Sequence, residues 1–152
     1  MYDIFVYLFE TCRQTDLSQD NELIARKLSA AGFEESEISE TLSWLAGVLR
    51  APHRTLAPLP GSARAIRAYA PKECAKLDAS CRGLLMRLGD IGVLDPVLRE
   101  LVVDRAMAAA GRTLSLDQLK LIVLMVLWNL ETPASRLIAE ELLAPAKHRL
   151  AN

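Results

Sequence analysis

Apolar residues recur every three or four positions along most of the chain, which is the spacing of amphipathic helices. In the N-terminal third this pattern predicts a first helix over residues 3–12 and a second over residues 20–31, with Gly32 at the left-handed position that ends it. A third helix follows, which Ser36 caps and whose apolar stripe reaches Val48.

The helical pattern stops between residues 51 and 62, where three prolines and a glycine exclude a regular helix. We therefore predict a Pro-rich loop or linker at 51–62, between an N-terminal helical subregion (1–50) and a C-terminal helical subregion (63–152). At most a short extended segment, over residues 66–69, precedes the central helix.

The central helix is predicted to begin at Pro71, which suits the first helical turn, and to continue to Leu88. Asp78 and Arg82 have the i,i+4 spacing of a surface ion pair on this helix. The apolar stripe that defines the helix consists of Cys74, Leu77, Cys81, Leu84, Leu85 and Leu88.

Further helices are expected towards the C-terminus. Asp95 caps a helix that ends at Gly111, and a capping box at Ser115–Gln118 starts a helix over residues 119–130. Pro133 opens the last helix. Because the 119–130 helix is apolar nearly all round, we expect it at the centre of the core.

The composition supports one all-α domain. With 152 residues, of which 51% are hydrophobic and only 5% aromatic, the chain is long enough for one core and too short for two ordinary domains. We therefore predict a single compact multi-helix domain over residues 1–152. The longest apolar stretch is too short to span a membrane, and the N-terminus lacks a basic start, so we expect a cytoplasmic protein without membrane association.

Charge is sorted by position along the chain. Residues 1–49 hold nine acidic and three basic side chains, residues 50–87 hold two and eight, and residues 88–152 hold eight and seven. Although the net charge is only −1, this order predicts one acidic and one basic surface. We call residues 50–87 the basic block.

No constellation of residues indicates catalysis, a metal or a cofactor. Cys74 and Cys81 are two helical turns apart, on the order of 10 Å, which excludes a disulfide within one helix. We expect both thiols to be buried as small hydrophobes. The cysteines and histidines lack paired zinc-ligand spacing, and no Gly-rich phosphate loop is present.

The sharpest candidate for binding is Gly83, which costs about 1 kcal/mol in mid-helix relative to alanine. With Ala79 it forms a small-residue notch between the cations Lys72, Lys76 and Arg87, and these five residues are our candidate binding surface, the basic notch. The notch would allow another helix, a phosphate or a ligand to approach, whereas packing of Gly83 within its own domain is the open alternative. Secondary basic candidates are Arg54, Arg64, Arg67 and Arg82.

Several local sequences resemble those of a known family. They are Met1-Tyr2-Asp3, Tyr7 to Thr11, the Gly32-Phe33 turn, Trp44 with Leu45, Pro71 to Cys74, Leu124 to Leu127 and, most specific, Leu-Asp-Ala-Ser-Cys-Arg-Gly at 77–83. Together they resemble the bacterial Smg family over essentially the whole chain. The resemblance implies a cytoplasmic proteobacterial protein from a functionally uncharacterised family, whose genes tend to lie near those for a DNA-processing protein and a topoisomerase.

Two functional hypotheses remain. We expect a non-enzymatic adaptor that binds a protein partner through a charged helical surface. The alternative is a nucleic-acid-binding accessory protein in DNA processing or topology that uses the basic block on phosphates. A pI near 6.1 and the four glutamates between residues 34 and 40 favour the first hypothesis. A homo-oligomer and pairing of the acidic and basic blocks within one molecule both stay open.

Overall fold

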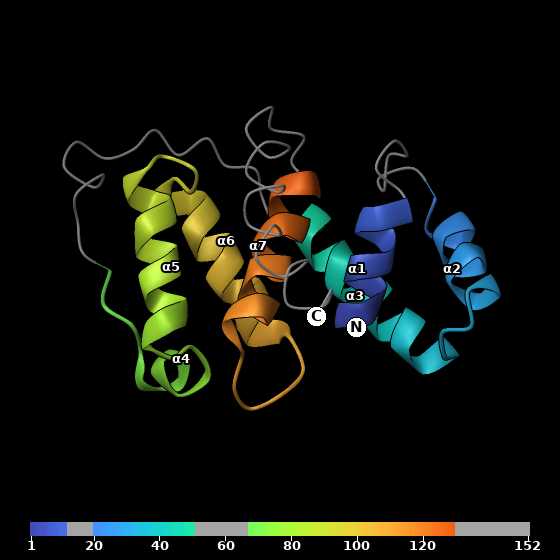
Figure 1. Cartoon of the computed structure of the whole chain (residues 1–152), viewed down its shortest axis with the longest axis horizontal. Helices are drawn as coiled ribbons and strands as arrows, with labels where there is room; N and C mark the ends of the chain where they lie inside the picture. The colour runs from blue at the N-terminus through green and yellow to red at the C-terminus, as the bar shows by residue number, and fades with distance from the viewer. Residues whose placement is uncertain (12–19, 51–66, 130–152) are drawn as a thin grey trace, which may run out of the picture.

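The computed structural model describes residues 1–11, 20–50 and 67–129, and in these ranges the protein is all-α (Figure 1). The helices are α1 (Tyr2–Thr11), α2 (Asn21–Ala30), α3 (Glu35–Arg50), α4 (Pro71–Lys76), α5 (Ala79–Asp90), α6 (Pro96–Ala108) and α7 (Leu116–Asn129). The predicted fold class is confirmed. The loop at 51–62 and the helix at Pro133 lie outside the described residues, and the division into subregions stays a prediction.

Local capping signals place α2 but not the start of α3. The Asp20 carboxylate accepts hydrogen bonds from the backbone N–H groups of Glu22 and Leu23, which caps α2 as its sequence position favours. Gly32 follows α2 with a φ of 92°, the left-handed conformation that glycine adopts without strain. The expected cap at Ser36 is wrong by two residues, because α3 already begins at Glu35.

The predicted central helix is two helices. α4 ends at Lys76, Leu77 has extended backbone, and Asp78 caps α5 by accepting from the Cys81 N–H at 2.8 Å. The break lets Leu77 form an isolated parallel bridge with Leu114, whose N–H donates to the Lys76 carbonyl at 2.9 Å. A continuous helix would use that carbonyl internally, so the break exchanges a helical bond for a tertiary one.

The expected Asp78–Arg82 ion pair is also wrong. The Asp78 carboxylate is the N-cap of α5, and Arg82 Nε instead donates to the Asp78 backbone carbonyl at 3.4 Å. A residue at an N-cap lies outside the regular helix, where i,i+4 spacing no longer places two side chains together.

The later helices follow their predicted starts. Asp95 caps α6, which ends at Ala108, three residues before the expected Gly111. The capping box before α7 has both of its bonds, Ser115 N–H to Gln118 Oε1 at 2.9 Å and Gln118 N–H to Ser115 Oγ at 3.2 Å.

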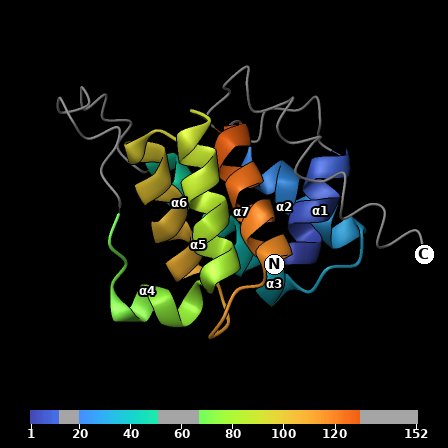
Figure 2. The same ribbon diagram turned by 60° about the vertical axis from the view of Figure 1, so that its left-hand side comes forward.

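Helix α7 occupies the centre, as its composition predicts. It packs against α1, α3, α5 and α6, and Figures 1 and 2 show it between the N-terminal helices and the α5–α6 pair. Six consecutive residues of α7, from Ile122 to Leu127, are buried. Outside α7, Trp44 of α3 joins the two sides by donating its Nε1–H to the Arg105 carbonyl of α6 at 2.9 Å. Figure 1 places α5 at one edge of the molecule and α2 at the opposite edge.

Candidate interaction surfaces

Lys76 of the basic notch is buried rather than exposed. Only 8% of the residue is accessible, and its ammonium donates to the carbonyls of Met107 and Ala109 at the end of α6. Burial lowers the pKa of Lys76 from its ordinary value. The cation therefore stabilises the C-terminal end of α6, where positive charge is favoured, and the expectation that it flanks an open notch is corrected.

Arg67, a secondary basic candidate, is neutralised inside the molecule. Its guanidinium donates to both oxygens of Glu73 at 2.9 Å and to both oxygens of Glu100 at 2.5 and 2.8 Å. The Arg67 bonds, followed by the Ala70 N–H, lower the pKa of Glu73 to about 2. This cluster joins the start of α4 to α6, and it engages four of the five guanidinium N–H donors of Arg67, which leaves one for a phosphate.

Arg82 is also held by groups of the protein. Its Nη1 lies 3.3 Å from the sulfur of Cys74, and its guanidinium carbon lies 6.0 Å from the centre of the Tyr69 ring. Arg67 lies 4.6 Å from the same ring. The Tyr69 ring therefore lies near two guanidinium groups beside the α4–α5 junction, and burial raises the pKa of Tyr69.

Three residues of the basic notch share one face of α5. Ala79, Gly83 and Arg87 have i,i+4,i+8 spacing, and a Cβ at Gly83 would meet no atom within 4 Å. The alternative that Gly83 packs against its own domain therefore does not hold for the described residues. Lys72 is exposed on α4, which Figure 2 shows crossing at an angle below α5. Arg54 and Arg64 lie outside the described residues.

The same face of α5 carries side chains that the sequence analysis missed. Met86 is 60% exposed and Asp90 is exposed at the end of the helix, while Ile91, just beyond it, is 65% exposed. Both could have been placed from the sequence, because Met86 and Asp90 follow Gly83 by three and seven residues and therefore lie on the same side of the helix. We call Ala79, Gly83, Met86, Arg87 and Asp90 the α5 outer face.

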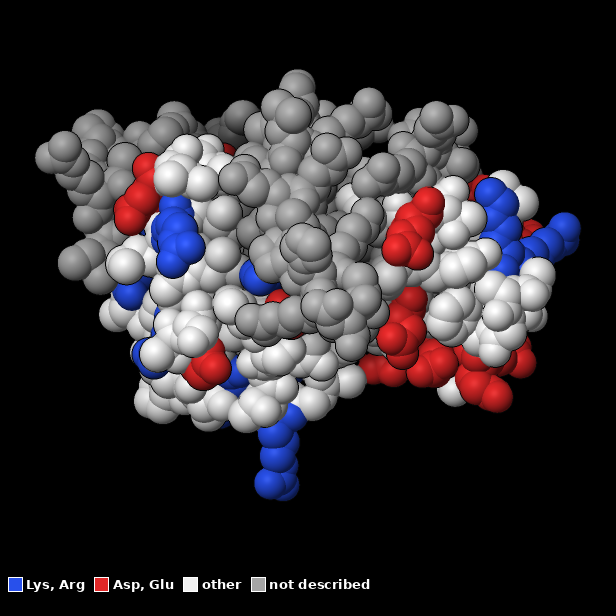
Figure 3. Space-filling model, in the orientation of Figure 1, with Lys and Arg blue, Asp and Glu red and all other residues white. Residues whose placement is uncertain are grey.

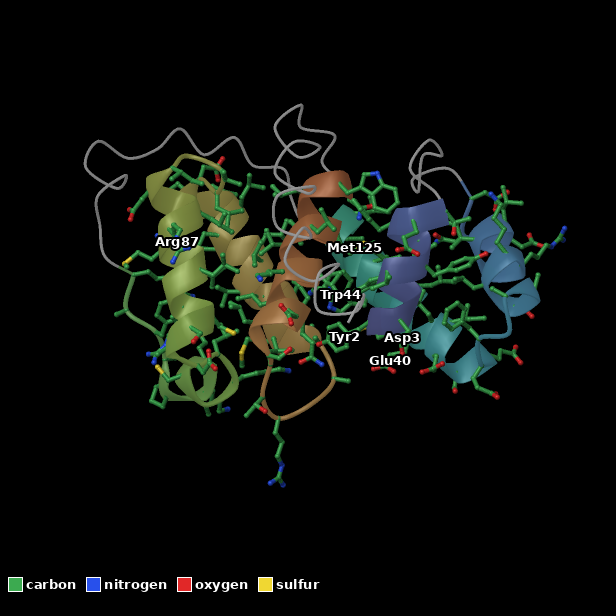
Figure 4. The ribbon with its side chains drawn as sticks, in the orientation of Figure 1. Tyr2, Asp3, Glu40, Trp44, Arg87 and Met125 are labelled. Carbon is green, nitrogen blue, oxygen red and sulfur yellow. The ribbon has the colours of Figure 1, made fainter. Side chains whose placement is uncertain are left out.

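A second surface lies at the other end of the molecule. The exposed carboxylates of Asp3, Glu34, Glu35, Glu37 and Glu40 form what we call the acidic face, where α1 and α3 begin (Figures 3 and 4). Among the described residues only Glu37 has an ion-pair partner there, the N-terminal ammonium at 3.9 Å. Nearby, burial and then the charge of Glu40 raise the pKa of Tyr2. Carboxylates at helix N-termini are stabilised by the helix dipole.

The two described cysteines differ in environment. Cys81 is fully buried, and burial together with the neighbouring Asp78 raises its pKa to about 11, which disfavours a nucleophilic thiolate. Cys74 is only half-buried, so the expectation of two buried thiols is right for Cys81 and wrong for Cys74. In the described ranges no group of histidine, cysteine and acidic side chains could hold a metal ion, and no helix has the length and apolarity needed to cross a membrane.

Comparison with known proteins identifies the family. Residues 1–151 match the family described as "Protein of unknown function (DUF494)". The chain is 49% identical over 144 residues to the Protein Smg homolog of Azoarcus sp. (strain BH72), covering 95% of this chain and 93% of that one. It is 49% identical over 151 residues to the Protein Smg homolog of Aromatoleum aromaticum, covering 99% and 97%, and 39% identical over 150 residues to that of Leptothrix cholodnii, covering 99% of both. No solved structure matches the chain. The chain belongs to the Smg (DUF494) family.

Proposed function

We propose that this protein is a non-enzymatic cytoplasmic interaction protein whose acidic face binds a protein partner that presents a basic surface. The charge that reaches the surface supports this function. Four of the five carboxylates of the acidic face have no ion-pair partner among the described residues, so their field extends into solvent.

One observation carries the choice between the two functional hypotheses. Of the six described cations in the basic block, Arg67, Lys76 and Arg82 are held by groups of the protein itself. Among these six described cations, only Arg50, Lys72 and Arg87 are exposed. Nucleic-acid binding depends on several cations that can neutralise phosphates together, and this number is small for that purpose.

The α2–α3 pair argues in the same direction. Two helices joined by a Gly-Phe turn resemble a small DNA-recognition unit, but α3 begins among Glu34, Glu35, Glu37 and Glu40. A helix whose N-terminal end carries this charge would be repelled from a DNA backbone. The same carboxylates are suited to lysines and arginines on a protein surface, where they also accelerate association.

The test is a pull-down from bacterial lysate with the full chain as bait, with and without nuclease, followed by a binding assay on the protein recovered. We expect one protein partner in both conditions and binding that weakens with salt. The triple variant Glu34→Gln, Glu35→Gln, Glu40→Gln should reduce the association rate at least tenfold, since it removes three charges from the acidic face.

A matched control removes the same charge elsewhere. The variant Glu10→Gln, Glu22→Gln, Asp117→Asn changes three exposed carboxylates outside the acidic face and should leave the association rate nearly unchanged. Loss of all bound material after nuclease treatment, or equal effects of the two triple variants, would contradict the proposed function.

A further inference from the structure

The α5 outer face has three features that are unfavourable in an isolated molecule. Gly83 lies in mid-helix, where it lowers helix stability, and no described atom lies where its Cβ would be. Met86 exposes 60% of its surface to water. Asp90 is the last residue of α5, where the helix dipole opposes a negative charge, and no ion pair compensates it in the described part of the chain.

These features lie along one line of the helix. At 100° per residue, Ala79, Gly83, Met86 and Asp90 fall within about 60° of one another, directly opposite the side that enters the core. That inner side consists of Cys81, Leu84, Leu85 and Leu88, all buried. The order along the outer line is small, small, large, acidic.

We propose that a second copy of this chain packs antiparallel on the α5 outer face, forming a symmetric dimer. A two-fold axis through the middle of α5 places Met86 of one copy opposite Gly83 of the other, because the two residues lie at equal distances on either side of the axis. The same axis places Asp90 opposite the partner's Ala79. Two Met86 side chains then fill two open Gly83 positions, the knob-into-hole arrangement of packed helices.

In this orientation the carboxylate of Asp90 meets complementary charge. Asp90 would lie over the first turn of the partner's α5, where Ala79 and Ser80 are exposed and the helix end carries partial positive charge. An acidic residue that is unfavourable on its own helix thus becomes favourable on the partner's. A parallel arrangement would instead place the two Asp90 carboxylates next to each other.

The second copy is therefore the occupant that accounts for all three features at once. A contact restricted to one helix from each chain is small beside the roughly 1,200–2,000 Å² of a stable interface, so we expect a weak dimer with a dissociation constant in the micromolar range or weaker. The surface is separate from the acidic face, and the inference does not depend on the proposed function.

Sedimentation of the full chain over a wide range of concentration tests the proposal. The wild type should pass from monomer to dimer, and Gly83→Leu should remain a monomer because its side chain occupies the position of the partner's Met86. Asp90→Lys should raise the dissociation constant roughly tenfold through its two symmetry-related contacts, although lysine favours the C-terminal end of its own helix. The matched control Asp104→Lys, on α6, should leave association unchanged.

Reversal of both charges tests the antiparallel register. Ala79→Glu combined with Asp90→Lys places a glutamate opposite the partner's lysine, and this double variant should recover the affinity that Asp90→Lys loses. Each of its substitutions also suits its own helix end, so the fold is retained, which a thermal melt verifies. A wild type that stays monomeric at every concentration, a dimer insensitive to Gly83→Leu, or a double variant without recovery would overturn the proposal.

Discussion

Residues 1–49, the acidic region, and the basic block carry equal and opposite net charge in the sequence but present it differently in the structure. Around α1 and α3 the carboxylates remain on the surface, mostly without ion-pair partners among the described residues. In the basic block Lys76 is buried on main-chain carbonyls and Arg67 lies between two glutamates. A run of like charge in a sequence therefore predicts a charged surface only when its side chains stay in solvent.

The difference has a simple physical origin. Glutamates at the start of a helix are stabilised there by the helix dipole, and they need no partner from elsewhere in the chain. Lysine and arginine have long apolar stems that can cross the surface of one helix and deliver the charge to another. Around α1 and α3 the carboxylates stay on the surface, whereas the basic block uses Arg67 and Lys76 to join the α4 segment to α6.

The largest expected effect is a difference in stability between variants of a buried lysine and of an exposed one. Lys76→Ala should lower the free energy of unfolding by about 3 kcal/mol, since it leaves two carbonyls at the end of α6 without a charged donor and removes a buried stem. Lys72→Ala, four residues away and exposed, should change it by less than about 0.5 kcal/mol. Urea denaturation of both variants measures the contrast. Equal losses would mean that the comparison between internal and external cations is wrong.

Most of the helical framework could be predicted because its signals are local. The predicted caps at Asp95 and Ser115 each act within three residues and are in place, whereas the predicted cap at Ser36 is not, because α3 begins at Glu35. The break at Leu77 was hidden because the apolar spacing of Cys74, Leu77 and Cys81 continues through it. Asp78 was the available signal for the break, since aspartate favours an N-cap over a helix interior.

The partners that bind the cations of the basic block could not be predicted from the local sequence pattern. Lys76 reaches carbonyls 31 and 33 residues further along the chain, and Arg67 reaches Glu100 across 33 residues. Neither spacing follows from helix periodicity, because both depend on how α4 crosses α6. Gly83 was different: its position on the outer side follows from the inner stripe of α5, and the open space around it agrees with that placement.

Arg67 gives the next largest effect. Arg67→Gln should lower the free energy of unfolding by about 2 kcal/mol, because Glu73 and Glu100 lose the cation that both carboxylates share and are left facing each other. The exposed Arg87, changed in the same way to glutamine, is the matched control and should have almost no effect on chemical denaturation. If Arg87→Gln lost as much stability as Arg67→Gln, the loss would reflect the removal of any arginine charge and not the disruption of this cluster.

Low pH should weaken the same cluster, because it protonates Glu73. The pKa of Glu73 is about 2 in the folded protein and about 4.5 in the unfolded chain, so its ionised form stabilises the fold fully above pH 4.5. That contribution disappears as the pH falls from 4.5 towards 2. Since solvent partly screens the pair, we expect ionised Glu73 to contribute about 1 kcal/mol to the free energy of unfolding. The difference in unfolding free energy between the wild type and Glu73→Gln should shrink over this range. A constant difference would show that ionisation of Glu73 is not coupled to folding.

The smallest effect compares two helical glycines, Gly83 on the α5 outer face and Gly47 at the contact between α3 and α6. Gly83→Ala should raise the free energy of unfolding by about 0.5–1 kcal/mol, because the new methyl group enters open space and alanine favours the helix. In Gly47→Ala the same preference is opposed, since the methyl group would collide with the Arg105 guanidinium, which lies against α3 with Nη1 3.5 Å from the Trp44 carbonyl. The Arg105 guanidinium must then move away from the Trp44 carbonyl, so the gain should be smaller than at Gly83. Thermal melts at low protein concentration, where self-association is absent, give both values. Equal stabilisation at the two sites would mean that Arg105 moves aside without cost and that the α3–α6 contact is looser than its hydrogen bonds indicate.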